Sequence, residues 1–178
     1  MKTFPLHIFL KYLFAILIII SPCHTRAQHF GSRLYNVTDG LPGASTYEAY
    51  EDSHSYLWIC TSAGLSCFDG RQFVSYSLID GLPSLHVLNV FEDSKNRLWI
   101  GTNAGMAQFK NNKFITYPVS DNQNNIWVFQ IMETRDKHVW ATTSKGVYEF
   151  ENNRWKKRIL FPGFENAACR QVVETEEG

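Results

Sequence analysis

The sequence predicts an all-β fold built from repeated units of four short antiparallel strands. One segment is written three times, as "EDSHSYLWICTSAG" from Glu51, "EDSKNRLWIGTNAG" from Glu92 and "ETRDKHVWATTSKG" from Glu133. Each copy alternates short β-prone runs with turn residues. No segment shows a sustained helical period, and the expected strands lie too close together to be joined by crossover helices.

The copies keep a constant spacing without a gap. Trp58, Trp99 and Trp140 recur every 41 residues, as the differences 99 − 58 and 140 − 99 show. The same spacing relates a threonine, a glycine and the aromatic residue that opens the last strand: Thr61, Thr102 and Thr143; Gly64, Gly105 and Gly146; Phe73, Phe114 and Trp155. Four strands in a period of this length are typical of a β-propeller blade.

The middle unit shows the expected elements in order. Residues 87–93 ("VLNVFED"), 98–102 ("LWIGT"), 106–109 ("MAQF") and 114–117 ("FITY") are the strands, and "SKNR", "NAG" and "KNNK" are the turns between them. Blades are expected at about residues 45–76, 86–117 and 127–158. Because a closed ring needs roughly four to eight blades, the sequence predicts an incomplete propeller of about three complete blades plus partial ones.

Partial units flank the three blades. Residues 32–42 ("SRLYNVTDGLP") resemble "VSYSLIDGLP" at the end of the first unit, so they are expected to supply the fourth strand that would complete the last blade of a full ring. A fourth blade begins near residue 168 and is cut off. We interpret the chain as an N-terminal fragment of a longer protein. Its open blade faces are expected to make it marginally stable and prone to aggregation.

The residues shared by all copies have structural roles in this interpretation. A tryptophan in the second strand fills the gap between adjacent blades, and a glycine opening the third strand permits positive φ. The threonine hydrogen-bonds the local backbone, and an aspartate caps the first turn. The structural set is Trp58, Trp99, Trp140, Gly64, Gly105 and Gly146.

Residues 1–27 are expected to be a signal peptide. An apolar run from Tyr12 to Ile20 follows Lys2 and Lys11, and it is shorter than the about 20 residues of a membrane span. An uncleaved N-terminal anchor is the alternative, and a lipid-anchored Cys23 is a weaker one because Pro22 precedes it. Residues 28–178 would then be the partial propeller, in the periplasm or another extracytoplasmic location.

Composition excludes several classes of protein. A formal net charge of +0 and 44% hydrophobic residues fit a globular domain and argue against nucleic acid as a partner. After cleavage Cys60, Cys67 and Cys169 remain, which is no disulfide framework, although Cys60 and Cys67 flank one hairpin and are a candidate pair. No histidine stands near them at metal-ligand spacing, so neither a metal nor a cofactor is expected.

The repeated unit resembles the two-component regulator propeller repeat. The matching motifs are "EDSHSYLWICTSAGLSCFDGRQFVSYSLIDGLP" and "EDSKNRLWIGTNAGMAQFKNNKFITY", and the similarity extends over about residues 34–178. The third unit departs from it, with "VWATT" for "LWIGT" and "DNQN" at Asp121–Asn124 for "DGLP".

The resemblance implies a periplasmic sensor region of a membrane-bound histidine kinase. Many relatives are hybrid kinases of Bacteroidetes that sense oligosaccharides and act through a phosphorelay. The implied partners are an oligosaccharide, the remaining propeller blades and the downstream sensor domains. The chain itself is not expected to be an enzyme. A free-standing secreted propeller that binds a glycan or a protein is the alternative, and a propeller enzyme is a further one.

The candidate ligand site lies where the copies disagree. The position that begins the first strand holds Ser45, then His86, then Trp127. The altered third linker places amide side chains beside Trp127, so the candidate ligand residues are His86, Trp127, Asn124 and Asn125. An aromatic plate flanked by amides suits sugar binding. Alternatively these side chains fill the channel mouth, or the face docks another domain or a homodimer mate.

An active site is not visible in the sequence. His54 and His138 fall in turns expected on the opposite face from His86, and no nucleophile stands beside a base. No residue is therefore expected to be catalytic.

Overall fold

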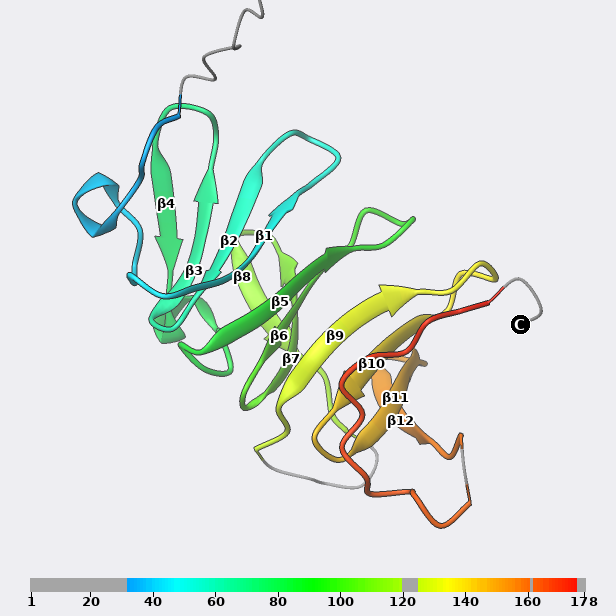
Figure 1. The fold of residues 1–178 in the computed structure, drawn as a ribbon. Coiled ribbons are helices and arrows are strands. Elements are labelled where there is room, and N and C mark those ends of the chain that lie inside the picture. The colour runs from blue at the N-terminus through cyan, green and yellow to red at the C-terminus, as the bar shows by residue number, and fades with distance from the viewer. Residues whose placement is uncertain (1–31, 120–124, 161, 176–178) are drawn as a thin grey trace, which may run out of the picture. The chain divides into compact units, whose positions relative to one another are not determined.

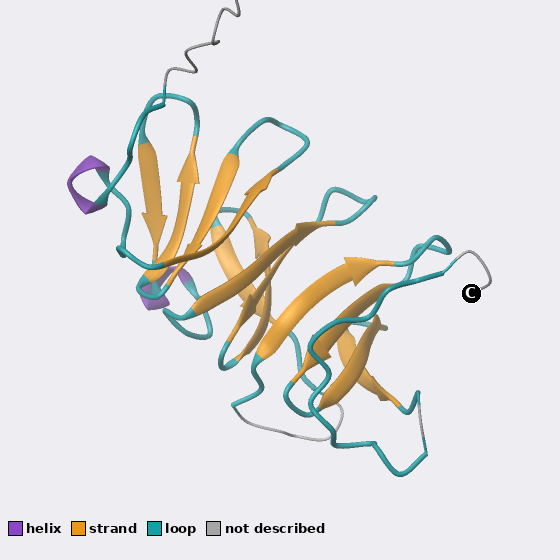
Figure 2. Ribbon diagram, in the orientation of Figure 1, coloured by secondary structure: helices purple, strands orange, loops and turns teal. Residues whose placement is uncertain are grey.

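The computed structural model describes residues 32–119, 125–160 and 162–175. The chain forms two compact units, Met1–Leu34 and Tyr35–Gly178, and the second contains all the strands. Within that unit the described residues form three four-stranded antiparallel sheets that follow one another along the chain (Figure 1). Figure 2 shows that strands and loops make up nearly all of it.

Each sheet is formed by four strands that are consecutive in sequence. The strands of blade one are β1 (Thr46–Glu51), β2 (Leu57–Thr61), β3 (Gly64–Phe68) and β4 (Phe73–Tyr76). Those of blade two are β5 (Val87–Glu92), β6 (Leu98–Thr102), β7 (Gly105–Lys110) and β8 (Lys113–Thr116). Those of blade three are β9 (Val128–Glu133), β10 (Val139–Thr143), β11 (Gly146–Glu151) and β12 (Arg154–Arg158).

The first strands of the blades form the inner side of the array. In every blade the spatial order equals the sequence order, so each sheet is a simple meander. Strands β1, β5 and β9 neighbour one another across successive blades (Figure 1). The predicted fold class, an incomplete β-propeller of four-stranded blades, is confirmed.

Aromatic side chains fill the gaps between blades. Trp58 lies edge-on to Phe109 of the next blade, with ring centroids 5.2 Å apart. Trp99 makes the same contact with Phe150 at 4.5 Å. Both indoles are almost fully buried, at 3% and 0% exposed. Burial of rings of this size supplies much of the hydrophobic stabilisation between the sheets.

Polar side chains on the first strands also link the blades. Glu48, Asn89 and Gln130 occupy one repeat position on β1, β5 and β9. Each side-chain oxygen accepts a backbone N–H bond from the next repeat: Glu48 from Val90 at 3.1 Å, Asn89 from Ile131 at 2.8 Å and Gln130 from Val172 at 3.1 Å. Burial raises the pKa of Glu48, and the hydrogen bonds that its carboxylate accepts from Val90 and Asn89 offset part of this effect.

The turn between the second and third strands has the same hydrogen-bond pattern in all three blades. Thr61 Oγ1 donates to the carbonyl oxygen of Gly64 at 2.8 Å and accepts from the N–H of Ala63 at 3.1 Å. Gly64 has φ +139°, a region that L-residues avoid. The same bonds join Thr102 to Gly105 and Thr143 to Gly146.

Residues 32–42 form no strand, and the three described sheets include no last blade that such a strand could complete. Residues Val37–Asp39 form a short 3₁₀ helix, η1, and Gly40 follows it with φ +114°. Asn36 and Asp39 cap this turn reciprocally. The second "DGLP" segment behaves in the same way, with η2 at Leu78–Asp80 and Gly81 at φ +96°.

The segment expected to begin a fourth blade near residue 168 forms no strand among residues 162–175. It runs beside blade three through two bonds from its N–H groups. Cys169 donates to the carbonyl of Thr143 at 2.9 Å, and Val172 donates to Gln130 Oε1 at 3.1 Å. Only one of these acceptors is a backbone carbonyl, so the segment does not form the regular backbone hydrogen bonds of a β-ladder with blade three.

The cysteines of the second unit are free thiols. Cys60 faces Leu65 and Cys67 faces Trp58 in the β2–β3 pairing, and the candidate pair Cys60–Cys67 is not formed. Cys60 is fully buried, and burial raises the pKa of Cys67 to about 11. Both therefore act as small packed residues. Among the described residues, no helix reaches the length and apolarity needed to cross a bilayer.

Candidate functional site

One backbone contact brings the three variable positions to a common face. The N–H of the turn between the second and third strands donates to the carbonyl oxygen of the residue that precedes the first strand. The pairs are Ser62 to Ser45 at 3.1 Å, Asn103 to His86 at 3.2 Å and Ser144 to Trp127 at 2.9 Å. The interblade linkers and these turns therefore lie together.

A groove of about 590 Å³ opens on this face between blades two and three. We call it the linker-face groove. Its walls come from the linker after η2, the β6–β7 turn and the segment that enters β9. The lining residues are Leu78, Pro83, Ser84, Leu85, Asn103, Ala104, Asn125 and Trp127.

Two of the four predicted ligand residues line this groove. Trp127 is 44% exposed, so much of its ring is available to a ligand. Its backbone is held on both sides by Ser144, because the N–H of Trp127 donates to Ser144 Oγ at 3.1 Å. Asn125 is exposed and has φ +56°, a conformation that asparagine tolerates better than most residues. Asn124 lies outside the described residues.

The remaining predicted residue, His86, lies beside the groove rather than in its wall. Its ring centroid is 6.0 Å from that of Trp127. On the other side it stacks on Tyr47 at 5.0 Å, and Tyr47 Oη lies 2.6 Å from His86 Nε2. Tyr47, His86 and Trp127 thus form an aromatic row across three blades.

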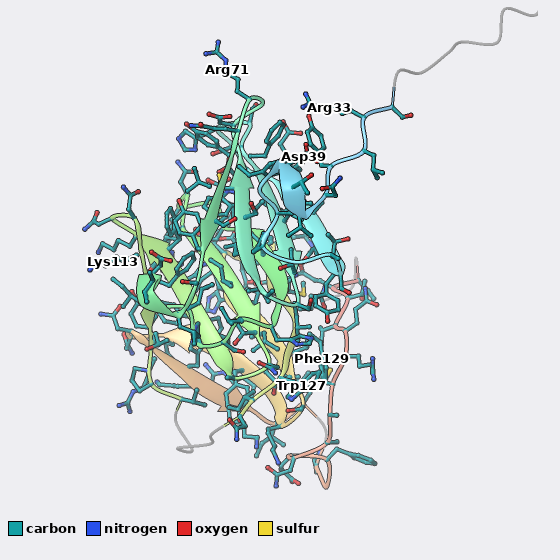
Figure 3. The ribbon with its side chains drawn as sticks, turned by 90° about the vertical axis from the view of Figure 1, so that its left-hand side faces the viewer. Arg33, Asp39, Arg71, Lys113, Trp127 and Phe129 are labelled. Atoms are coloured by element: carbon teal, nitrogen blue, oxygen red, sulfur yellow. The ribbon has the colours of Figure 1, made fainter. Side chains whose placement is uncertain are left out.

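The sequence did not point to Tyr47, because the variable position compared among the copies is that of Ser45, two residues earlier. Its position follows from an irregularity of register in β1, where Thr46 faces Thr61 but Glu48 already faces Cys60. Tyr47 is the extra residue of this β-bulge, and bulges commonly re-aim a side chain. Phe129 is the corresponding residue of β9, between Val128 and Gln130. Figure 3 shows it close to Trp127 where the chain enters that strand.

Asn103 is a second residue that the sequence did not single out. It lines the groove, and its Oδ1 atom is buried without a hydrogen-bond partner among the described residues. Buried acceptors are nearly always paired in folded proteins, so an orphan in the wall of a groove is notable. No charged side chain belongs to the described lining of the groove.

The other histidines lie in different surroundings. His138 hydrogen-bonds Glu149, and this bond together with the carboxylate charge raises the pKa of His138. His54 lines a separate pocket between blades one and two with Asp52 and Asp69. Among the described residues, no three side chains of the metal-ligating types cluster.

Comparison with known proteins identifies the repeat. Residues 81–104 match the model of the family described as "Two component regulator propeller". This confirms the resemblance predicted from the repeated motif. No curated protein matches the chain.

Solved structures share the fold. One is the extracellular domain of what is described as the hybrid two component system BT3049 of B. thetaiotaomicron, with 24% identity over 68% of this chain and a TM-score of 0.59. Another is the extracellular domain of BT4673 from the same organism, described as a one component system, with 20% identity over 75% and a TM-score of 0.63. Virginiamycin B lyase of Staphylococcus aureus is more distant, with 15% identity over 61% of this chain, 38% of its own length covered and a TM-score of 0.50.

The chain is short beside two of these solved structures. It spans 19% of the BT3049 structure and 21% of the BT4673 structure. At these identities the likeness establishes the propeller fold.

Proposed function

We propose that this chain, which carries a two-component regulator propeller repeat at residues 81–104, is a ligand-sensing part of an extracytoplasmic signalling protein. Its ligand in this proposal is an oligosaccharide, bound at the linker-face groove. The structures that support the signalling role are extracellular domains described as parts of two component and one component systems. The remaining blades and downstream sensor domains of such a protein are the proposed covalent partners.

The observation that carries the proposal is the composition of the groove. Trp127 supplies an accessible aromatic plate, and Asn103 and Asn125 supply amides beside it. Sugars present apolar C–H faces that stack on aromatic rings and hydroxyl groups that pair with amides. A groove that places amides beside an aromatic plate therefore suits a pyranose.

The matched segment and the groove coincide in sequence. Gly81–Ala104 contains five of the groove residues: Pro83, Ser84, Leu85, Asn103 and Ala104. The matched repeat thus contributes one wall of the groove, while Trp127 and Asn125 lie outside the match.

Calorimetric titration of the purified chain tests the proposal. The probes are cellohexaose, xylohexaose, maltohexaose and hexagalacturonate. We expect at least one to bind, and Trp127→Ala to weaken that binding at least tenfold because the stacking surface is lost. If no probe binds, or if Trp127→Ala binds as the parent chain does, the groove is not a sugar site.

A matched control separates binding from folding. Trp140 belongs to the repeat but lies outside the groove, in a separate pocket with Met132 and Val172. Trp140→Phe keeps an aromatic ring there, so the affinity for the probe should equal that of the parent chain. A loss of affinity equal to that of Trp127→Ala would indicate a general effect of tryptophan replacement.

A further inference from the structure

We propose that a pocket between blades one and two binds a guanidinium group, such as that of an arginine side chain. The pocket has a volume of about 510 Å³, and residues of both blades line it. We call it the interblade pocket. Its rim comes from the β1–β2 and β3–β4 turns, whereas the linker-face groove opens at the β6–β7 turn, at the other ends of the strands. The inference therefore adds a second site and does not depend on sugar binding.

The interblade pocket has a negative rim. The carboxylates of Asp52, Asp69 and Glu92 line it, and none of its described lining residues is a lysine or an arginine. Burial raises the pKa of the Cys67 thiol in the same lining to about 11, and the charges of Asp52 and Asp69 add to this rise. A cleft lined by one sign of charge attracts the opposite sign, so the pocket favours a cation.

Aromatic rings lie beside these carboxylates. Tyr56 is 43% exposed, and the rings of Tyr76 and Phe109 are partly buried in the wall of the pocket. A cation over the face of an aromatic ring is attracted by the ring's quadrupole. Among organic cations, a guanidinium is planar and weakly hydrated, so it stacks on such rings while its N–H groups pair with a carboxylate.

The next repeat shows how the protein holds such a group. Between blades two and three, Cζ of Arg97 lies 5.1 Å from the ring centroid of Trp99 and 5.5 Å from that of Phe150. Its Nε atom donates to Asp93 Oδ2 at 2.6 Å. The chain thus places one of its own guanidinium groups against an aromatic pair and a carboxylate.

Blade one keeps the partners of this guanidinium but lacks the arginine. Trp58, Phe109 and Asp52 stand one period of 41 residues before the three groups that contact Arg97, and Tyr56 stands in place of Arg97 itself. Asp52 Oδ2 accepts the indole N–H of Trp58 at 2.8 Å and, among the described residues, no second donor. Since a carboxylate oxygen can accept two bonds, this atom retains the capacity that the arginine uses in blade two.

Burial shows the same difference between the two sites. Asp93, which Arg97 covers, is 3% exposed, whereas Asp52 remains partly exposed. Trp58 is also only 3% exposed, so a ligand would contact the partly exposed ring of Phe109 rather than the indole. The bound guanidinium is therefore expected to pair with Asp52 and to pack on Phe109.

Nuclear magnetic resonance titration of the whole chain with N-acetylarginine amide tests the proposal. We expect a dissociation constant of about 1 mM, and binding of the uncharged N-acetylcitrulline amide to be about tenfold weaker. The indole N–H resonance of Trp58 should shift because it donates to Asp52, and that of Trp99 should not. No binding of the arginine probe at about 10 mM, or equal binding of the citrulline probe, would overturn the proposal.

Two further probes define the ligand class. N-acetyllysine amide should bind more weakly than the arginine probe, because an ammonium group is more strongly hydrated than a guanidinium. Equal or tighter binding of the lysine probe would overturn the preference for a guanidinium. Methylguanidinium carries the same group without an amide backbone. Tighter binding of the arginine probe than of methylguanidinium supports an arginyl peptide as the ligand, and equal binding supports a small guanidinium compound.

Tyr56→Arg is the decisive variant, because it gives blade one the residue found in blade two. The new guanidinium should occupy the site, so the affinity for the arginine probe should fall about tenfold while the melting temperature stays equal or rises. A folded Tyr56→Arg chain that binds the probe as the parent chain does would overturn the site.

Ile79→Arg is the matched control. Ile79 is 91% exposed and does not line the interblade pocket. The variant adds the same charge elsewhere on the surface, where salt screens it, so its affinity should stay within about twofold of that of the parent chain. An equal loss of affinity in both arginine variants would show that net charge controls binding, and it would overturn the assignment of the pocket.

Discussion

The carboxylate of Asp93 accepts a 2.8 Å hydrogen bond from the indole N–H of Trp99. Asp93 is 3% exposed, and its other oxygen accepts the backbone N–H groups of Lys95 and Arg97. One side chain thus closes the first turn of the blade and satisfies the buried indole. Asp52 and Trp58 form the same pair in blade one, also at 2.8 Å.

Asp93→Ala should therefore be strongly destabilising. It leaves the indole N–H of Trp99 and the turn donors without an acceptor, and it removes the ion pair that Arg97 Nε makes at 2.6 Å. We expect a loss of about 3 kcal/mol in the free energy of unfolding, measured by urea denaturation. A loss below about 1 kcal/mol would show that the pair contributes little.

Blade three offers the converse substitution. Thr134 stands where the other blades have aspartate, and the indole N–H of Trp140 is buried without a partner among the described residues. Thr134→Asp should supply the missing acceptor and raise the free energy of unfolding by about 1 kcal/mol. The same denaturation experiment measures it. A decrease would mean that repulsion from nearby Asp136 outweighs the new bond.

Alanine substitutions at two of the repeated glycines, Gly64 and Gly105, should destabilise the chain to different extents. A Cβ atom at Gly64 would stand 2.6 Å from the carbonyl oxygen of Tyr76, whereas one at Gly105 would meet nothing within 4 Å. Both residues have strongly positive φ. Gly105→Ala should therefore cost about 1–2 kcal/mol from backbone strain alone, and Gly64→Ala should cost clearly more. Equal losses in thermal denaturation would contradict this difference.

The two kinds of tryptophan should respond differently to truncation. Trp99→Ala opens a cavity against Phe150 and Trp155 and should cost about 3–5 kcal/mol of stability. Trp127→Ala removes a half-exposed ring and should leave the melting temperature nearly unchanged. Differential scanning calorimetry of both variants measures this contrast. Similar melting temperatures would show that Trp127 is a core residue.

His138 predicts a pH dependence of stability. Its hydrogen bond to Glu149, then the carboxylate charge, raises its pKa above the ordinary value of 6.5, while Asp136 raises it and Arg158 lowers it to smaller extents. A raised pKa in the folded state favours the protonated form. The stabilisation is thus complete below about pH 6.5 and is lost as pH rises through the folded pKa.

Thermal melts across this pH range check the prediction. The parent chain should become less stable above pH 6.5, and His138→Gln should flatten that part of the profile, because the glutamine does not titrate. Identical profiles for the two proteins would show that other groups control the pH dependence.

The architecture was accessible from sequence because its signals are local and repeated. The expected second strand, residues 98–102, coincides with β6, and the expected third strand differs from β7 by one residue at each end. Residues 33–35 align with residues 74–76 of β4, but they belong to none of the three described sheets. The capped turn that follows them matches the turn that follows β4.

The contacts of the candidate site were harder to predict because they depend on neighbouring blades. Tyr47 reaches His86 only through a bulge that shifts the register of β1. Asn103 Oδ1 has no partner among the described residues, whereas the N–H of His86 donates to Ser84 Oγ. Neither contact has a signature in a single repeat. Comparing the copies still pointed to the face on which the linker-face groove opens, because Trp127 and Asn125 differ from their counterparts and line that groove.

A crystal structure of the chain with the hexasaccharide that binds most tightly tests the assignment of the linker-face groove most directly. The predicted result is a pyranose ring stacked on Trp127, with its hydroxyl groups within hydrogen-bonding distance of the side-chain amides that line the groove. A sugar bound elsewhere on the blades, with the groove empty, would contradict it.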